Sequence, residues 1–102
     1  MHRLIAENRA ELSRLCTHHR VRRLELFGSA AAEGDNRPVS DMDFLVEFEE
    51  MEPGAYAEAY FGLRDSLISL LDKPVDLVVI SAIENPFFLR GIEPNRTVLY
   101  AS

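Results

Sequence analysis

Apolar residues in the first part of the chain return at helical intervals. From Arg3 to about Thr17 they are separated by polar side chains, chiefly Arg and Glu, and they comprise Leu4, Ile5, Leu12, Leu15 and Cys16. Because residues three or four apart share one face of an α-helix, this spacing predicts an amphipathic helix over this range.

Polar and apolar positions alternate in the segment that follows. Leu24 and Leu26 alternate with Arg23 and Glu25 before Phe27, and the run stops at Gly28, which predicts a short strand that ends in a tight turn. Segment 30–38 contains Gly, Asp, Asn and Pro and is expected to form a loop. Segment 43–48 is rich in β-forming residues and predicts a second strand.

The second half of the chain combines a long helical pattern with a short apolar run. After the Pro-Gly pair at 53–54, apolar residues recur every three or four positions as far as Leu71, which predicts a helix that ends before Pro74. Segment 75–80 is almost uniformly apolar, which predicts a strand buried on both faces at the centre of a sheet. Asp76 interrupts that apolar run.

A short helix is expected over 86–90 and a last small strand over 96–100. The order helix, strand, strand, helix, strand, short helix, strand predicts an α/β (α+β) fold with helices packed on a mixed sheet. A length of 102 residues suits one hydrophobic core. We therefore expect a single domain over residues 1–102.

Composition and charge narrow the class of protein. With 47% hydrophobic and 27% charged residues, the chain is typical of a soluble globular protein. Arg and Glu interrupt the apolar residues of the amino-terminal segment, so we expect neither a signal peptide nor a membrane span, and we place the protein in the cytoplasm. The net charge of −6 argues against a sequence-independent grip on nucleic acid, and hence against a nucleic-acid polymerase.

The cysteine and histidine residues indicate neither a disulfide nor a zinc site. The single cysteine, Cys16, excludes an internal disulfide and is expected to be a buried thiol on the first helix. His2, His18 and His19 do not combine with it, or with one another, at the spacing of a zinc site. We expect them at the surface near a helix end.

Two aspartates stand one residue apart at the start of the second predicted strand. Side chains at i and i+2 of a strand share a face, roughly 6.6 to 7 Å apart at their Cα atoms, so Asp41 and Asp43 can point toward one place. Without a counter-ion they would repel, and a divalent cation such as Mg²⁺ or Mn²⁺ removes that difficulty. Asp76 could complete the cluster if its strand lies beside theirs.

Gly28 and Ser29 have the features of a phosphate-binding turn. Glycine lets the backbone approach an anion closely, and the Ser hydroxyl and nearby N–H groups can donate to phosphate oxygens. A nucleoside triphosphate would place its phosphates on this turn while the metal at the aspartates bridges them. An incoming hydroxyl would then attack the α-phosphate, and pyrophosphate would leave.

Each motif taken alone also has a structural explanation. A Gly-Ser pair is common in turns, and Asp-x-Asp near a strand start is compatible with a helix cap or a solvated edge. The combination is more specific: Gly-Ser closes one strand, Asp-x-Asp opens the next, and a third Asp lies within an apolar strand. This joint pattern favours a functional site.

The segments LFGSAA (26–31), SDMDFLV (40–46), KPVDLVVI (73–80) and RTVLY (96–100) resemble motifs of the DNA polymerase beta nucleotidyltransferase superfamily. The small size is similar to its minimal nucleotidyltransferase branch, and the resemblance covers nearly the whole chain. It implies the palm-like core of that superfamily. The residues implied to bind the nucleotide are Gly28, Ser29 and Ser40. The residues implied to ligate the metal and form the catalytic centre are Asp41, Asp43 and Asp76.

The resemblance also implies an activity and a partner. Minimal nucleotidyltransferases of this kind are typically antitoxins that pair with a HEPN-class RNase toxin in a hetero-oligomeric complex. The implied reaction is Mg²⁺- or Mn²⁺-dependent transfer of AMP from ATP to a tyrosine hydroxyl of the toxin. The loop between Ser29 and Asp41 is one residue longer and less basic than is usual in the family, and Arg37 is the basic residue available to bind phosphate there.

Two alternatives remain open at the level of sequence. One is a non-catalytic antitoxin that blocks its toxin by binding alone and has kept the aspartates by descent. The other is a nucleotidyltransferase that acts on a small hydroxylated molecule, although enzymes of that kind generally carry a further domain to hold the acceptor. Replacement of Asp41 and Asp43 by Asn separates catalysis from binding.

Overall fold

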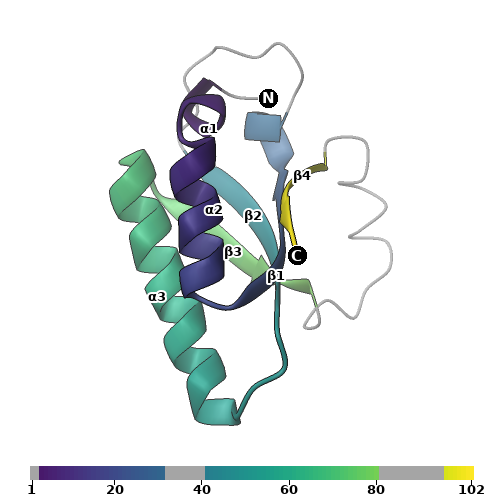
Figure 1. Cartoon of the computed structure of the whole chain (residues 1–102). Helices are drawn as coiled ribbons and strands as arrows, with labels where there is room; N and C mark the ends of the chain where they lie inside the picture. The colour runs from purple at the N-terminus through teal and green to yellow at the C-terminus, as the bar shows by residue number, and fades with distance from the viewer. Residues whose placement is uncertain (1–2, 32–40, 81–95) are drawn as a thin grey trace.

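A four-stranded mixed sheet with helices on one face forms the framework of the protein in a computed structural model (Figure 1). The structure describes residues 3–31, 41–80 and 96–102. Within them the helices are α1 (Arg3–Glu7), α2 (Arg9–His18) and α3 (Pro53–Leu71), and a 3₁₀ turn η1 spans Gly28–Ala31. The strands are β1 (Val21–Phe27), β2 (Met42–Phe48), β3 (Val75–Val79) and β4 (Thr97–Ala101).

The strand order of the sheet is β3-β2-β1-β4. Strand β1 runs antiparallel to both β2 and β4, whereas β2 and β3 are parallel and are connected through α3. Parallel neighbours require such a crossover, because a tight turn can join only antiparallel strands. It follows that the end of β1 and the starts of β2, β3 and β4 all lie at one end of the sheet.

The hydrophobic core lies between the sheet and the helices α2 and α3 (Figure 1). Strand positions that face the core alternate with positions on the opposite face, as the two-residue period of a strand requires. The fully buried core side chains of the two central strands are Val21, Leu24, Leu26, Met42, Phe44 and Val46. Glu25, Asp43 and Asp76 occupy the intervening positions and therefore belong to the face of the sheet opposite α2 and α3.

The predicted amino-terminal helix is in fact two helices separated at Asn8. The Asn8 side-chain amide donates a hydrogen bond to the Leu4 carbonyl oxygen at 2.8 Å, and the Asn8 backbone N–H bonds the Ile5 carbonyl oxygen. Asn readily competes with the helix backbone in this way, so a local hydrogen bond interrupts the helix even though the apolar spacing continues. Cys16 is buried on α2 as expected, and burial raises its pKa to about 12.

The prediction that segment 75–80 forms the central strand is wrong. In the sheet built by the described residues, β3 is an edge strand; of its residues, Leu77 is buried and Asp76 is exposed. A uniformly apolar run reports that a strand is hydrophobic, but it carries no information on which strands become its neighbours. The expectation that Asp76 lies within a strand buried on both faces is therefore wrong, and its role has to be judged from its position.

The other expected elements agree with the structure where it describes them. Helix α3 begins with Pro53 in its first turn and ends at Asp72, which adopts the left-handed conformation with φ 53°. His18 is exposed and His19 half-buried at the end of α2. The helix expected over 86–90 lies outside the described residues. No helix among the described residues is long and apolar enough to cross a membrane.

Candidate active site

Gly28 terminates β1 and brings the chain backbone against a carboxylate of β2. Its φ of +72° lies in the left-handed region, which residues other than glycine rarely adopt. A Cβ atom at this position would collide with Oδ2 of Asp43 and would lie 3.3 Å from its Cγ atom. The sequence therefore places glycine where both the turn and the close approach to Asp43 require it.

Asp43 and Asp76 stand opposite each other on the neighbouring strands β2 and β3. Asp43 is also opposite Phe27, the last residue of β1, so one row across the sheet joins the end of β1 to both aspartates. Neighbouring strands lie about 4.8 Å apart, and opposed residues point to the same face. Two carboxylates from distant parts of the sequence are thus side by side, with Asp43 half-buried and Asp76 exposed.

The electrostatic environment of Asp43 is unfavourable to its charge. Burial raises the pKa of Asp43, and the negative charges of Asp76 and then Asp41 raise it further. Among the described residues, no Lys, Arg or His forms an ion pair with any of the three aspartates. A proton or a cation bound at the site would relieve this unfavourable interaction.

Asp41 is placed differently from the other two. It immediately precedes β2 and is exposed, so its charge acts on Asp43 from outside the strand. Within residues 3–31, 41–80 and 96–102, no three carboxylate, thiol or imidazole side chains stand close enough together to hold one ion as they are placed. Magnesium is commonly bound by one or two carboxylates together with substrate phosphates. The oxygen donors of the Asp43–Asp76 pair fit that requirement.

The remaining predicted nucleotide-binding residues are only partly visible. The backbone of Ser29 belongs to the 3₁₀ turn that begins at Gly28, next to Asp43. Its side chain, like Ser40 and Arg37, lies outside the described residues.

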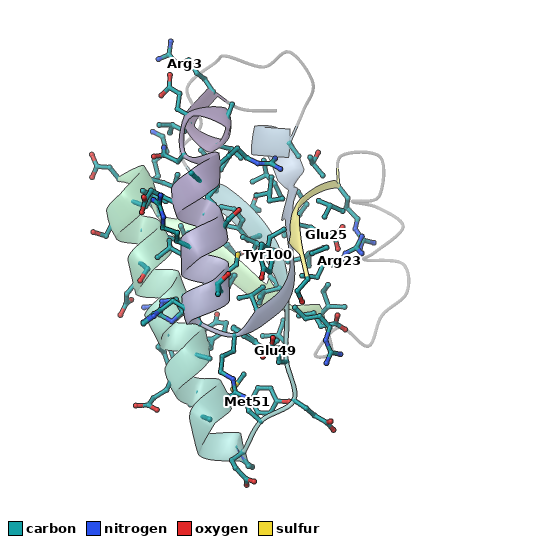
Figure 2. The ribbon with its side chains drawn as sticks, viewed as in Figure 1. Arg3, Arg23, Glu25, Glu49, Met51 and Tyr100 are labelled. Atoms are coloured by element: carbon teal, nitrogen blue, oxygen red, sulfur yellow. The ribbon has the colours of Figure 1, made fainter. Side chains whose placement is uncertain are left out.

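An ion pair on the same face of the sheet was not expected from sequence. The Glu25 side chain is only 3% exposed; Arg96 Nη2 donates to its Oε2 at 2.7 Å, and Arg96 Nε donates to its Oε1 at 3.0 Å. Arg23 Nε adds a longer contact of 3.3 Å to Oε2 (Figure 2). Burial favours a raised pKa for Glu25, but the hydrogen bonds and charge of Arg96, together with Arg23, outweigh it and lower that pKa.

Glu25 has the position of a solvent-facing residue in the alternating pattern of β1. Its carboxylate is paired with Arg96, which lies 71 residues away in the sequence and just before β4. The residues near Glu25 in the sequence give no indication of this pairing, because its partner is far away in the chain. The pair attaches the start of β4 to β1 beside the row that carries Asp43.

Comparison with known proteins agrees with this arrangement. Residues 9–99 match the sequence profile of the family described as the nucleotidyltransferase domain. Two proposed protein adenylyltransferases of Methanocaldococcus jannaschii are 36% and 40% identical to this chain over 75 residues. Each of these alignments covers 74% of this chain, and they cover 73% and 72% of the relatives, respectively.

Solved structures share the fold. A proposed minimal nucleotidyltransferase superposes with a TM-score of 0.72 at 29% identity, covering 91% of this chain and 90% of that one. A toxin–antitoxin structure with AMP-PNP gives 0.67 at 23% identity, covering 93% and 74%. The tri-AMPylated Shewanella oneidensis HEPN toxin in complex with its MNT antitoxin gives 0.63 at 21% identity, covering 95% and 72%. At these last two identities the likeness establishes the fold alone.

Proposed function

The chain belongs to the nucleotidyltransferase domain family, and on this premise we propose that it is a protein adenylyltransferase and the antitoxin of a toxin–antitoxin pair. It transfers AMP from ATP to a tyrosine hydroxyl of a HEPN-class toxin and thereby neutralises that toxin. The relatives named as adenylyltransferases and the toxin–antitoxin complexes of the same fold support this proposal. We expect the reaction to take place in the cytoplasm.

The observation that carries the proposal is the row formed by Asp43 and Asp76 beside Gly28. Like charges held together on a sheet, with burial opposing the charge of one of them, are a cost to the folded protein. Such clusters are concentrated at functional sites, where a ligand compensates for them. A purely structural role for the pair gives no reason to keep both carboxylates.

Each residue has a distinct task in the proposed reaction. The Gly28-Ser29 turn binds the triphosphate through its backbone N–H groups, and the missing Cβ of Gly28 leaves room for the Asp43 carboxylate. Asp43 and Asp76, with the exposed Asp41 before β2, would hold Mg²⁺ or Mn²⁺, and such an ion would supply positive charge to the phosphates. Ser40 is assigned to nucleotide binding by the family resemblance.

The bonds that change follow from these positions. The acceptor oxygen forms a bond to the α-phosphorus, the bond from that phosphorus to the bridging oxygen breaks, and pyrophosphate leaves with the electron pair. We assign Asp76 to receive the proton of the tyrosine hydroxyl, because it is the exposed member of the pair at the edge of the sheet. A docked protein supplies the acceptor, so the small domain does not need to enclose it.

The test is the intact mass of the toxin after co-expression with this protein. We expect an increase of one or more AMP units with the wild-type chain and none with the Asp41→Asn, Asp43→Asn double variant, while the complex still forms. An unchanged toxin mass in a stable complex would contradict the enzyme proposal. Neutralisation that survives the double substitution would instead support an antitoxin that acts by binding alone.

A further inference from the structure

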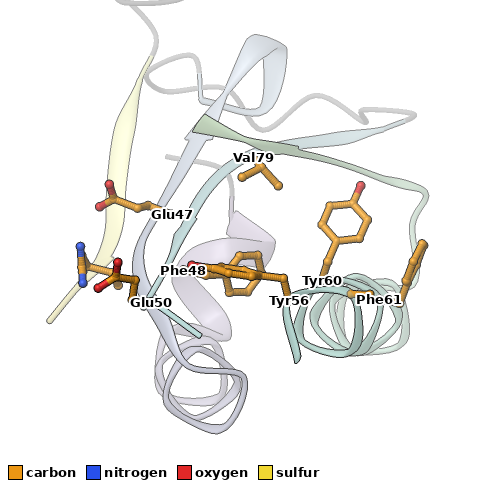
Figure 3. Close-up of a pocket in the computed structure, with 9 residues that line it drawn as sticks. Glu47, Phe48, Glu50, Tyr56, Tyr60, Phe61 and Val79 are labelled. Carbon is orange, nitrogen blue, oxygen red and sulfur yellow. The ribbon is translucent and has the colours of Figure 1, made fainter. Parts of the chain in front are cut away.

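A large apolar groove lies where α3 meets the ends of β2 and β3, away from the aspartates (Figure 3). Its volume is about 770 Å³. The apolar side chains that line it are Phe48, Tyr56, Ala57, Tyr60, Phe61 and Val79. We refer to these six residues as the apolar groove. Its volume falls in the range of pockets that bind ligands or the side chains of a partner.

Two aromatic side chains of the groove are exposed to solvent. Phe61 is 53% exposed and Tyr56 is 37% exposed, and they are two of the four exposed large hydrophobic residues in the described part of the chain. Contiguous apolar surface of this kind marks interaction sites, whereas isolated exposed residues do not. Ile68, on the same helix but outside the groove, is an isolated example.

The groove is held in its open shape by contacts within the protein. The Tyr60 hydroxyl donates a hydrogen bond to the Leu77 carbonyl oxygen of β3 at 2.7 Å. The ring of Phe61 packs edge-to-face against Tyr60, with ring centroids 5.1 Å apart. The Arg64 guanidinium lies over the Phe61 ring, 5.5 Å from the ring centroid. Because these contacts already restrict the side chains, a partner would lose little free energy in ordering them, which favours its affinity.

The spacing of the groove residues on α3 is that of a helix-packing surface. Tyr56 and Tyr60 form one row at i and i+4, and Ala57 and Phe61 form the adjacent row. The small side chain of Ala57 beside large ones creates the depression between ridges that a second helix fills. An amphipathic helix in a hydrophobic groove is a recurring mode of protein recognition.

The rim of the groove is acidic. Glu47 and Glu50 line it together with Arg22 (Figure 3). Glu49 and Glu52 lie in the same short segment, and Glu49 is paired with Arg20 at 3.7 Å. The segment 47–52 thus has more negative charge than the nearby arginines balance, in a chain of net charge −6. Charge complementarity favours a partner with Lys or Arg beside its apolar face.

We propose that the apolar groove is the docking site for a basic amphipathic helix of the protein that accepts AMP. This inference rests on the proposed function for the identity of the partner, but its location is independent of the catalytic row. Asp43 and Phe48 are five residues apart on β2, which corresponds to about 16 Å. The groove therefore determines affinity for the acceptor, and the row at the other end of the sheet determines the chemistry.

The first test uses a synthetic probe, so that it does not depend on the natural partner. A helical peptide of Leu and Lys, about 18 residues or five turns long, is compared with a peptide in which Glu replaces every Lys. We expect the Lys peptide to slow hydrogen exchange of backbone amides in the first half of α3 and at the end of β2. Equal binding of both peptides, or protection only elsewhere, would overturn the proposal.

Matched variants locate the binding surface. Phe61→Gln should weaken binding of the Lys peptide by at least about tenfold, as expected for a central aromatic anchor. Ile68→Gln, on the same helix, should leave that binding unchanged. Glu47→Gln with Glu50→Gln should weaken binding and reduce its dependence on salt, whereas Glu58→Gln, outside the groove, should not. If the wild-type chain instead forms a dimer that Phe61→Gln abolishes, the occupant is a second copy and the proposal is wrong.

The natural partner distinguishes this inference from the proposed function. With a HEPN-class protein that forms a complex with the wild-type chain, Phe61→Gln should weaken complex formation by at least about tenfold and leave the binding of an ATP analogue unchanged. Asp43→Asn should have the opposite effects: complex formation persists, but AMP transfer is lost. Absence of AMP transfer by the wild-type chain, in a complex that Phe61→Gln still weakens, would contradict only the enzyme proposal. If Phe61→Gln left the affinity of the complex unchanged, that result would contradict only the proposal that the groove is the docking site.

Discussion

Asp43 of β2 and Asp76 of β3 are direct neighbours across two parallel strands, and Gly28 abuts the carboxylate of Asp43. The pairing places two negative charges on one face of the sheet, and in the described part of the chain neither has a cationic partner. The folded protein therefore tolerates a repulsion that binding of a cation would remove. The consequences of this repulsion and of the contacts around it can be measured.

Replacement of Asp43 by Asn should stabilise the ligand-free protein while abolishing nucleotide transfer. The pKa of Asp43 is raised in the folded state, so the folded protein holds this proton to a higher pH than the unfolded chain does. The cost of ionisation is absent below the unfolded pKa and is fully present once the pH exceeds the folded pKa. The gain should thus appear at pH 7 and disappear in acid, and it should stay below about 1 kcal/mol because the side chain is partly solvated.

Thermal unfolding at several pH values checks this prediction. Asp65→Asn is the matched control, because Asp65 is an exposed aspartate of α3 whose only described ion pair is with Arg64 at 3.8 Å. The control should show no comparable rise in Tm at pH 7. A lower Tm for Asp43→Asn at that pH would mean that the carboxylate stabilises the fold.

Divalent cation and nucleotide together should stabilise the wild-type protein. A ligand that binds only the folded state contributes about 2.7 kcal/mol at a concentration 100 times its Kd. We expect the Tm to rise with Mg²⁺ and a non-hydrolysable ATP analogue, to fall back on addition of EDTA, and to respond much less in Asp43→Asn. Differential scanning fluorimetry gives the comparison. An equal rise in both proteins would show that the nucleotide binds without this carboxylate.

Gly28→Ala should destabilise the fold through both its backbone conformation and its contact with Asp43. A residue other than glycine at this φ costs about 1 to 3 kcal/mol. In an Asp43→Ala background the collision is removed but the strain is not, so the cost of Gly28→Ala should become smaller. Gly54→Ala is the control, because a Cβ there meets no atom within 4 Å. Urea denaturation measures the free energy of unfolding of the wild type, the two single variants at Gly28 and Asp43, the double variant and the control. Equal costs of Gly28→Ala in the two backgrounds would exclude the contact with Asp43 as a cause.

Glu25→Gln should destabilise the protein by about 1 to 3 kcal/mol, because it removes the charge that Arg96 and Arg23 contact while both arginines keep access to solvent. The pKa of Glu25 is lowered in the folded state, so its contribution to stability is present above the unfolded pKa and is lost as the pH falls through the folded pKa. The difference between wild type and variant should therefore shrink in acid.

The control for Glu25 is Glu7→Gln. Glu7 pairs with Arg3 at 3.4 Å on the exposed face of α1, and such surface pairs contribute about 0 to 1 kcal/mol. Urea midpoints at pH 7 and at pH 4 distinguish the two variants. A cost for Glu25→Gln as small as that of Glu7→Gln would mean that the Arg96 contact is dispensable.

Much of the local structure follows from nearest-neighbour physics and was predictable. The two-residue alternation before Gly28 and the helical period up to Leu71 depend on residues only a few positions apart, and both predictions are confirmed. The broken helix at Asn8 is the exception among local features. There a side-chain hydrogen bond competes with the backbone, which an apolar pattern does not register.

The sequence by itself determined the types of element and the glycine turn, and it supplied the residues that we propose bind phosphate and metal. Only the tertiary structure decided that β3 is an edge strand, that Asp43 and Asp76 are opposite each other, and that Arg96 reaches Glu25. Strand order depends on how α3 crosses the sheet and on contacts between residues far apart in the chain. Hydrophobicity records that a residue will be buried, but which partner it meets depends on the packing of the whole domain.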